Sequence, residues 1–366
     1  MKELEREILI IGAGPAGISA AIEAAKAGAK VTVADEHDTI GGQLYKQIHK
    51  FFGAADNHAG MRGFEIARKH EQKAKELGVE FWLNTVAYGI FKEGVGIVRD
   101  GDNFIVKAKK VIVAAGGIEN TTAFPGSTLP GVMLAGAAQT MTNIHRVLPG
   151  KRMVVVGSGN VGLIVAYQML QAGAEVLAVV ERDDHIGGYG VHAEKIRTAG
   201  VPILTDTIIK CASGKTSVEG VTTVKLGADG AEIAGSEQEF NADTVIMAVG
   251  MAPLTELLWN IGCRFEFIGE LGGYVPVHNE FMQTSVDGIY AAGDITGVEE
   301  ASVAMEEGCI AGIAAASACG HISAEECSAR CASHIDALAV LESGEYDGER
   351  SAARAKKLEL YKASEK

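Results

Sequence analysis

Residues 8–17 read Ile8-Leu9-Ile10-Ile11-Gly12-Ala13-Gly14-Pro15-Ala16-Gly17, and this stretch decides the fold. Its aliphatic run predicts a short buried strand, and the spacing of its three glycines is typical of the loop between such a strand and a helix. An alanine-rich helix is expected next and should end at Gly28. A second apolar run, 31–34, then leads to Asp35. This order predicts a strand–helix–strand unit whose helix amino terminus holds a diphosphate.

The same pattern occurs a second time. Residues 153–162 read Met-Val-Val-Val-Gly-Ser-Gly-Asn-Val-Gly, followed by an apolar helical run and by a strand that leads to Glu181. Each copy is closed by a further apolar strand, at 111–116 and at 244–250. An internal duplication on this scale indicates two nucleotide-binding domains of one architecture.

A third strand-like segment, 288–294, ends in Gly293-Asp294 and fits the last strand of the first sheet. The predicted fold class is therefore α/β, with two Rossmann-like three-layer domains, the second inserted in the first. Residues 1–120 and 251–330 would form the first domain, and 121–250 the second. Residues 331–366 are expected to form a charged carboxyl-terminal helix or tail.

Composition excludes several classes of protein. The 366 residues carry 33 Lys and Arg against 47 Asp and Glu, a net charge of −14, so no nucleic-acid partner is expected. The apolar fraction of 47% argues against disorder. The acidic start does not resemble a secretory signal, and the long uncharged runs are interrupted by glycine, proline or polar residues, so we expect a cytoplasmic protein with no membrane span. Six cysteines occur without a CxxC motif, and no metal site is expected.

Six segments together resemble the two-dinucleotide-binding flavoproteins of the thioredoxin reductase and disulfide reductase superfamily. They are IGAGPAGISAA (11–21), ADEHDTIGGQL (34–44), VIVAAGG (111–117), VVVGSGNVG (154–162), TVIMAVG (244–250) and GIYAAGDITG (288–297). The resemblance implies FAD in the first site. It also implies that Gly293 and Asp294 contact the ribityl and diphosphate region, and that the loop of Gly41, Gly42 and Gln43 runs beside the flavin.

One departure from that superfamily bears on function. Thioredoxin reductases carry a redox CxxC ahead of the second glycine motif, and glutathione reductase-type enzymes carry a cysteine pair after the first acid. Residues 131–140 and 41–45 contain no cysteine. Disulfide reductase chemistry is therefore disfavoured, because electrons need a thiol pair to leave through a protein disulfide.

A narrower resemblance rests on GGQLYKQ (41–47), FPGSTLPGVMLAGAAQT (124–140) and GSGNVGLIVAYQMLQAGAEVLAVVE (157–181). These segments are similar to the nucleotide-binding subunits of opine oxidase, hydrogen cyanide synthase and dye-linked L-proline dehydrogenase complexes. The resemblance implies an electron-transferring subunit of a heteromeric amine, amino-acid or imino-acid dehydrogenase. Its partners would be a second flavoprotein dehydrogenase subunit and, as a further candidate, a small iron–sulfur subunit. The second site would hold NAD(H) or ATP, or would remain as a scaffold without a ligand.

Two alternatives stay open: a stand-alone NAD(P)H:acceptor flavin oxidoreductase and a non-catalytic nucleotide-binding assembly subunit. No catalytic side chain is assigned, because a bound flavin supplies the difficult chemistry. His49, His58, His70, Lys46 and Lys50 are interpreted as ordinary loop or surface residues.

The candidate cofactor-binding residues form two sets. The first set comprises Gly12, Ala13, Gly14, Pro15, Ala16, Gly17, Asp35, Glu36, Gly41, Gly42, Gln43, Leu44, Val86, Ala114, Ala115, Gly116, Gly293, Asp294 and Ala301. Ala301 begins a helix that is expected to aim the backbone N–H groups of Ala301 and Ser302 at the flavin. The second set comprises Gly157, Ser158, Gly159, Asn160, Val161, Gly162, Glu181, Arg182 and Gly250. An acid at Glu181 would favour NAD over NADP, although the adjacent Arg182 leaves this open.

Overall fold

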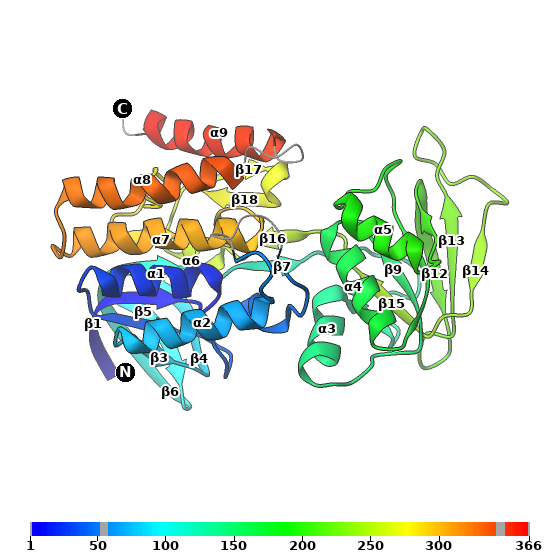
Figure 1. Ribbon diagram of the computed structural model, residues 1–366, viewed down its shortest axis with the longest axis horizontal. Coiled ribbons are helices and arrows are strands. Elements are labelled where there is room, and N and C mark those ends of the chain that lie inside the picture. Colours follow the sequence, from blue (N-terminus) through cyan, green and yellow to red (C-terminus); the bar gives the residue numbers. More distant parts are fainter. Residues whose placement is uncertain (1, 52–57, 342–347, 365–366) are drawn as a thin grey trace. The chain divides into compact units, whose positions relative to one another are not determined.

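The computed structural model describes residues 2–51, 58–341 and 348–364 (Figure 1). The chain divides into two compact units, one formed by Met1–Ile118 with Ala252–Lys366 and the other by Glu119–Met251. Short strands β7 (Gly117–Glu119) and β16 (Met251–Pro253) pair where the chain passes from one unit to the other. No helix among the described residues combines the length and the apolar character needed to cross a membrane.

The first unit is built on a parallel sheet in the order β3-β2-β1-β6-β19. The first half of the long strand β6 also continues sideways into an antiparallel β5–β4 hairpin. The strands are β1 (Lys2–Ile11), β2 (Val31–Ala34), β3 (Glu80–Trp82), β4 (Thr85–Phe91), β5 (Gly94–Arg99), β6 (Asp102–Val113) and β19 (Ile289–Ala291).

The two faces of this sheet bury alternate residues of β1, as the two-residue period of a strand requires. Ile8 and Ile10 pack with helices α1 (Pro15–Lys26), α7 (Ala301–Ala318) and α8 (Ala324–Leu341), which follow one another on one side of the sheet (Figure 1). Leu9 and Ile11 pack on the other side with the β4–β5 hairpin and Leu258. Helix α1 begins at Pro15, just beyond the carboxyl end of β1 at Ile11.

Glycines allow α1 and α7 to approach closely. A Cβ at Gly308 would lie 2.1 Å from the carbonyl oxygen of Ala16, and one at Gly312 would lie 2.2 Å from that of Ala20. Both positions therefore exclude any larger residue, and the close packing holds the start of α7 beside the start of α1. The remaining elements of this unit are η1 (Gly42–Lys46), α2 (Gly63–Glu76), α6 (Glu256–Asn260), β17 (Phe265–Ile268), η4 (Gly269–Leu271), β18 (Gly273–Pro276), η5 (Asp294–Thr296) and α9 (Gly348–Ser364).

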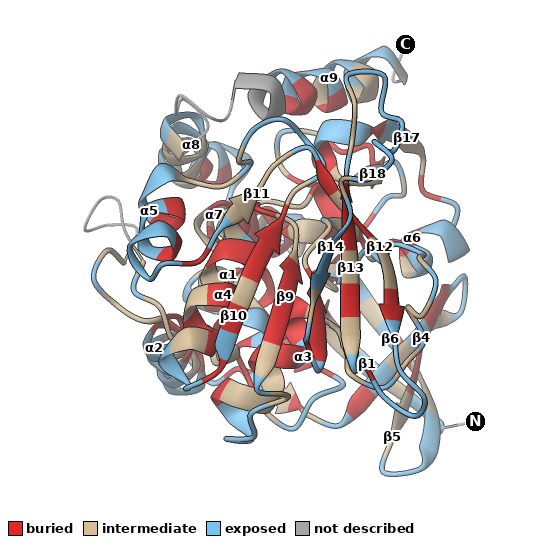
Figure 2. Ribbon diagram, turned by 90° about the vertical axis from the view of Figure 1, so that its right-hand side faces the viewer, coloured by how far each residue is buried: buried red, intermediate tan, exposed pale blue. Residues whose placement is uncertain are grey.

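The second unit repeats the layers of the first. Its parallel sheet has the order β11-β10-β9-β15-β8, with helices α3, α4 and α5 on one face and the antiparallel β12-β13-β14 sheet on the other. Figure 2 shows β9 and β10 as largely buried strands. The elements are β8 (Val132–Leu134), α3 (Ala135–Gln139), η3 (Thr140–Ile144), β9 (Arg152–Val156), α4 (Asn160–Gln171), β10 (Glu175–Val180), α5 (Gly190–Thr198), β11 (Ile203–Leu204), β12 (Thr207–Ser213), β13 (Gly220–Lys225), β14 (Gln238–Phe240) and β15 (Thr244–Met247).

The carboxyl-terminal region differs from the segmentation proposed from sequence. Helix α8 continues without a break through residue 331, because Cys327 and Cys331 are buried in the core beside α7. Helix α9 packs Ala353 against Ile268 and its neighbours in the β17–β18 hairpin. Two charged residues of α9 are also buried, so part of the segment expected to be a charged periphery belongs to the interior of the first unit.

Candidate functional site

The glycine loop between β1 and α1 is shaped by two positions that admit no side chain. A Cβ at Gly12, where φ is +104°, would lie 2.3 Å from the carbonyl oxygen of Ala114, and a Cβ at Gly17 would lie 1.9 Å from that of Gly12. A Cβ at Gly14, by contrast, would meet no described atom within 4 Å. The first and third glycines thus close the turn, while the second leaves backbone open to a diphosphate.

Asp35 lies at the end of β2 and fixes this loop. Its Oδ2 accepts the backbone N–H of Ala13 at 2.6 Å, and its Oδ1 accepts that of His37 at 2.9 Å. The side chain is nearly buried yet borders a cavity. A carboxylate has about four acceptor positions, so Asp35 keeps capacity for the hydroxyls of a ribose.

The glycine loop opens into a cavity of about 560 Å³, within the usual range for a ligand pocket of roughly 300–1,000 Å³. The structure brings most of the first predicted set together around it: Gly12, Gly14, Pro15, Ala16, Asp35, Glu36, Gly42, Gln43, Leu44, Val86, Ala114, Ala115, Gly116, Gly293, Asp294 and Ala301. The cavity, the open Gly14 and the acid at its end fit the diphosphate and ribose of a dinucleotide.

Three predicted residues lie just behind the cavity wall. Ala13 and Gly41 are joined by a hydrogen bond from the Gly41 N–H to the Ala13 carbonyl at 2.9 Å, and Gly17 packs under Gly12. These residues shape the loop instead of lining the cavity. Lining residues that the sequence did not single out include Ile11, Ala34, His37, Gln47, Thr85, Ala87, Tyr88, Gly117, Ile118, Leu254, Glu256, Leu257, Ala292, Glu299 and Ala304.

The start of α7 borders the same cavity, as the helix-dipole argument requires. Ala301 and Ala304 line it, so the unpaired N–H groups of the first helical turn lie beside it. Ser302 itself is among the residues that line a different cavity, while the expectation for its backbone N–H stays a prediction. Successive residues of a helix point about 100° apart, which separates Ser302 from Ala301.

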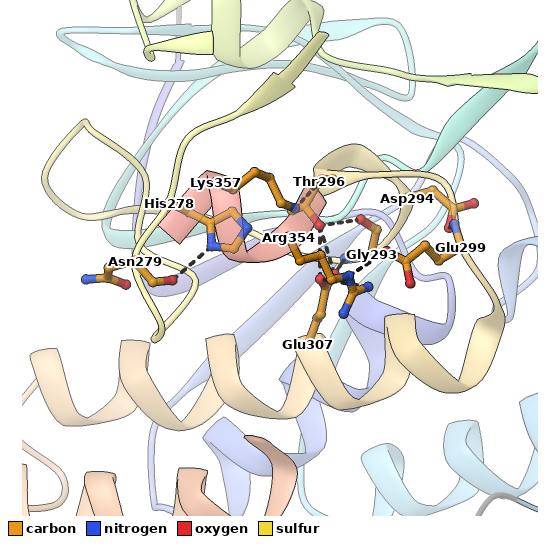
Figure 3. A network of polar contacts seen from close by, with 9 residues as sticks. All are labelled: His278, Asn279, Gly293, Asp294, Thr296, Glu299, Glu307, Arg354 and Lys357. Carbon is orange, nitrogen blue, oxygen red and sulfur yellow. Dashed lines mark hydrogen bonds and ion pairs between the residues drawn. The ribbon is translucent and has the colours of Figure 1, made fainter. Parts of the chain in front are cut away.

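A buried polar network lies behind Gly293 and Asp294 (Figure 3). Glu307 accepts the Gly293 N–H at 2.8 Å and the Thr296 hydroxyl at 2.9 Å. Arg354 of α9 pairs with Glu299 at 2.5 Å and with Glu307 at 3.5 Å, and the ammonium of Lys357 donates to the carbonyl of Thr296. The carboxyl-terminal helix therefore supplies the cations that neutralise two buried carboxylates beside the cavity.

Burial changes the protonation of the acids in this region. It raises the pKa of Asp294 to about 6, against the lowering effect of a hydrogen bond from the Glu299 N–H. It also raises the pKa of Glu299, and the guanidinium of Arg354 opposes part of that rise. The wall of the cavity thus carries acids that exchange protons nearer to neutral pH than ordinary carboxyl groups do.

The second glycine loop has the geometry of the first. A Cβ at Gly157 would lie 2.1 Å from the carbonyl oxygen of Ala248, and one at Gly162 would lie 2.0 Å from that of Gly157, while a Cβ at Gly159 would meet no described atom within 4 Å. Gly157 and Gly162 therefore close this turn as Gly12 and Gly17 close the first, and Gly159 leaves the backbone open as Gly14 does.

Glu181 takes the place of Asp35 in the second unit, although it falls one residue later in sequence. Its Oε2 accepts both the N–H and the hydroxyl of Ser158, each at 2.7 Å. The extra residue is taken up within β10, where the pairing with β9 shifts register between Val176 and Ala178, so Glu181 follows its strand as Asp35 follows β2. Around this loop, Asn160 accepts the Tyr189 N–H at 2.8 Å, Val161 is 43% exposed, and Arg182 and Gly250 are exposed. The second predicted set thus combines a formed loop with accessible neighbours.

The two units also share a glycine pair that was not predicted as a repeat. Ile40-Gly41-Gly42 follows Asp35 at the same distance at which Ile186-Gly187-Gly188 follows Glu181. A Cβ at Gly42 would lie 2.8 Å from the Cα of Gly14, and one at Gly188 would lie 2.9 Å from the carbonyl carbon of Gly159. In both units this glycine pair lets a following loop lie directly on the glycine turn between strand and helix, and the matched spacing could have revealed it.

No cysteine is found among the described residues that line the first cavity. The six cysteines are free thiols, and Cys327 and Cys331 lie in the hydrophobic core between α7 and α8. The discounted side chains are also absent from the described lining: His49, His58, His70, Lys46 and Lys50.

The comparisons with known proteins agree with this geometry. A sequence profile described as pyridine nucleotide-disulphide oxidoreductase matches residues 6–308. An opine oxidase subunit of Rhizobium meliloti is 31% identical over 345 residues, which cover 88% of this chain and 65% of that protein. Hydrogen cyanide synthase subunit HcnB of Pseudomonas protegens is 28% identical over 83% of this chain and 69% of its own length. The chain thus spans about two thirds of the length of these curated relatives.

Solved structures share the fold. L-proline dehydrogenase from P. horikoshii has a TM-score of 0.69 with 23% identity over 92% of this chain and 59% of its own. Thioredoxin reductase from T. acidophilum has a TM-score of 0.69 with 24% identity over 86% of this chain and 98% of its own. FAD and a pyridine nucleotide are the cofactors of the matched family. With its profile match over most of the sequence and its two dinucleotide-binding frames, the chain belongs to the pyridine nucleotide-disulphide oxidoreductase family, a family of FAD-dependent oxidoreductases.

Proposed function

We propose that this chain is the FAD-binding, electron-transferring subunit of a heteromeric dehydrogenase that oxidises an amine, an amino acid or an imino acid. One observation carries the proposal: the first cavity has a complete dinucleotide-binding frame, yet no cysteine occurs among its described lining residues. Electrons that reach this site cannot pass to a protein disulfide in its wall and must pass to another carrier.

The first cavity is the proposed FAD site. Backbone N–H groups around Gly14 would bind the diphosphate, Asp35 would accept from the adenosine ribose, and Gly293 with Asp294 would face the ribityl chain. When bound, FAD supplies the capacity to accept and release electrons, while the protein binds and orients it. The first turn of α7 would place positive dipole ends near the negative charge of the reduced cofactor.

The names of the relatives support a partner-dependent role. The matched chains of opine oxidase, sarcosine oxidase and hydrogen cyanide synthase are each named as one subunit of the respective enzyme. We propose that the partner that handles the substrate is a second flavoprotein dehydrogenase subunit. A small iron–sulfur subunit is the further partner proposed to carry electrons onward.

The ligand of the second glycine loop distinguishes the two alternative functions. Its three glycines and Glu181 are arranged as a nucleotide site, for which NAD(H) or ATP is the proposed ligand. With NAD(H) there, the chain could act as a stand-alone NAD(P)H:acceptor oxidoreductase. With ATP there, a binding and assembly role would be favoured.

The decisive experiment is to isolate the tagged full-length chain with its native complex. Co-purifying proteins and released nucleotides are then identified by mass spectrometry, and flavin absorbance is followed anaerobically after adding NADH or amino-acid substrates. We expect bound FAD, a co-purifying dehydrogenase subunit, and substrate-dependent bleaching only when that subunit is present. Rapid bleaching by NADH with the isolated chain would support the stand-alone alternative. Full-rate amino-acid oxidation by the isolated chain would overturn the proposal.

A further inference from the structure

The first unit contains a second cavity, of about 620 Å³, which shares no lining residue with the dinucleotide cavity. Helices α1, α2, α7 and α8 all contribute to its wall. Unlike the dinucleotide cavity, it is lined mainly by ionisable side chains, among them three histidines and one cysteine. Nothing in the proposed redox function uses these groups.

Three of these side chains form a compact cluster. Glu306 and Cys309 are three residues apart on α7 and therefore share a helix face, and His334 reaches them from α8. One carboxylate oxygen, one sulfur and one imidazole nitrogen all lie within 4.8 Å of one another. The carboxylate of Glu306 is 2.6 Å from Nδ1 of His334. This hydrogen bond joins two potential metal ligands, Glu306 on α7 and His334 on α8.

The donor set matches the chemistry of zinc. Zn²⁺ accepts thiolate, imidazole and carboxylate ligands at about 2.0–2.3 Å in a tetrahedral arrangement, so neighbouring ligand atoms stand roughly 3.3–3.8 Å apart. The carboxylate and imidazole would need to separate by about 1 Å, a change that small side-chain rotations can supply. We infer that Glu306, Cys309 and His334 form a binding site for Zn²⁺ or a chemically similar divalent transition metal.

Two further histidines border the same space. The rings of His58 and His70 are 5.2 Å apart, and both line the cavity. The Nδ1 atom of His70 is buried and has no hydrogen-bond partner among the described residues. Two lysines that line the cavity are paired with acids. The Nζ atom of Lys26 lies 2.6 Å from a carboxylate oxygen of Glu23, and that of Lys73 lies 3.9 Å from a carboxylate oxygen of Glu76. The fourth coordination position therefore faces a cavity that can offer water or a further imidazole.

Coordination here would be a ligand exchange without a redox change. The S–Zn bond forms as the Cys309 thiol loses its proton to solvent. The proton between Glu306 and Nδ1 of His334 also leaves Nδ1, either to solvent or by a tautomer change that places it on Nε2, and the carboxylate and the imidazole then each form a bond to the metal. The metal would join α7 to α8, and the first turn of α7 lines the dinucleotide cavity. Sequence spacing did not reveal this site because Cys309 and His334 are far apart in the chain and meet only when the two helices pack.

The test uses the full-length, FAD-loaded chain, stripped with a chelator and then supplied with ZnCl₂. Bound zinc is measured by elemental mass spectrometry after gel filtration, its affinity by calorimetry, and alkylation of each cysteine by peptide mass spectrometry. We expect one equivalent of zinc, protection of Cys309 from alkylation, and a higher unfolding temperature. Cys309→Ser and His334→Gln should each lower the affinity at least about tenfold, because both remove a direct ligand.

Control variants test whether zinc binding depends on the cluster of Glu306, Cys309 and His334. Cys211→Ser and His321→Gln change a cysteine and a histidine outside the cluster and should leave zinc binding unchanged. Cys309→Ser is nearly isosteric, and Glu306→Gln preserves a hydrogen-bonding side chain, so both should fold with FAD bound. The inference is overturned if the wild-type protein retains no zinc, or if Cys309→Ser and His334→Gln bind it as tightly as the control variants do.

Discussion

The carboxylate of Glu307 accepts the backbone N–H of Gly293 at 2.8 Å, which ties α7 to the glycine that lines the dinucleotide cavity. Glu307 also contacts Arg354, so this buried side chain connects the carboxyl-terminal helix to the cavity (Figure 3). A buried carboxylate is stable only when cations and hydrogen-bond donors surround it. Helix α9 is therefore part of the architecture that supports the proposed FAD site.

Replacing Arg354 with methionine should destabilise the first unit strongly. The side chain is 9% exposed, and its removal leaves two carboxylates that are 5% and 4% exposed without their guanidinium. We expect a loss of about 3–5 kcal/mol in the free energy of unfolding, the usual effect of leaving a buried charge unpaired. Denaturant unfolding of the FAD-saturated chain measures it.

Arg330→Met is the matched control for this change. Arg330 pairs with Glu326 one helical turn away, and both side chains are well exposed. Such pairs contribute about 0.2–1 kcal/mol, so this variant should unfold almost like the wild type. Equal effects of the two substitutions would show that the buried network is not held by Arg354.

The duplicated sequence predicted the site best where one chemical requirement fixes both residue type and spacing. Gly12 and Gly17 are needed because any side chain would meet a backbone oxygen, and Gly157 and Gly162 repeat this requirement. Such constraints act between residues close in sequence, so a motif can reveal them. The prediction of two layered α/β folds from the strand and helix periods is confirmed by the architecture.

The network around Glu307 could not be predicted in the same way. Arg354 and Lys357 lie in a charged stretch whose composition is typical of a solvated helix. Their burial depends on acids in α7 and on the β17–β18 hairpin, which are remote in sequence. A period or motif within a short window contains no information about such long-range pairing.

Alanine substitutions at the two open glycines should separate the two nucleotide sites. Gly14 has φ −75° and Gly159 has φ −64°, values that alanine adopts without strain, so apo stability should change by less than about 1 kcal/mol. The added methyl at Gly14 would occupy the space proposed for the diphosphate. Gly14→Ala should weaken FAD binding at least about tenfold, whereas Gly159→Ala should leave it unchanged, as measured by flavin fluorescence titration. FAD loss in both variants would argue against separate sites.

Glu181→Gln should relax the proposed preference of the second site for a nucleotide without a 2′-phosphate. Glutamine keeps an acceptor for Ser158 but removes the negative charge. Calorimetry with ADP-ribose and its 2′-phosphate measures the ratio of affinities. We expect the ratio to shift about tenfold toward the phosphorylated ligand, since removing one like-charge repulsion near the surface is worth on the order of 1–2 kcal/mol. Glu175→Gln, at the start of the same strand, is the control, and an unchanged ratio in Glu181→Gln would contradict the assigned role.

His278 should make stability depend on pH. It is buried, and this burial, followed by the charge of Lys357, lowers its pKa to about 3, while its Nδ1 lies 2.8 Å from the Asn279 carbonyl oxygen. The folded protein therefore keeps this imidazole neutral, and the unfolded chain takes up a proton below its ordinary pKa of about 6.5. The resulting stability is complete above pH 6.5 and is lost as the pH falls toward 3. At pH 5 the loss is about 2 kcal/mol.

A comparison of pH slopes isolates this contribution from that of Asp294, whose raised pKa acts in the opposite direction between about pH 6 and pH 4. Asp294 is present in both wild type and His278→Asn, so its effect cancels in the difference. We expect His278→Asn to be less stable at pH 7.5 but to lose about 2 kcal/mol less than the wild type between pH 7.5 and pH 5. His145→Asn, at an exposed position, should keep the wild-type slope. Parallel curves for wild type and His278→Asn would mean that His278 takes up its proton at the same pH in the folded protein as in the unfolded chain, because only a difference between the two pKa values changes the slope.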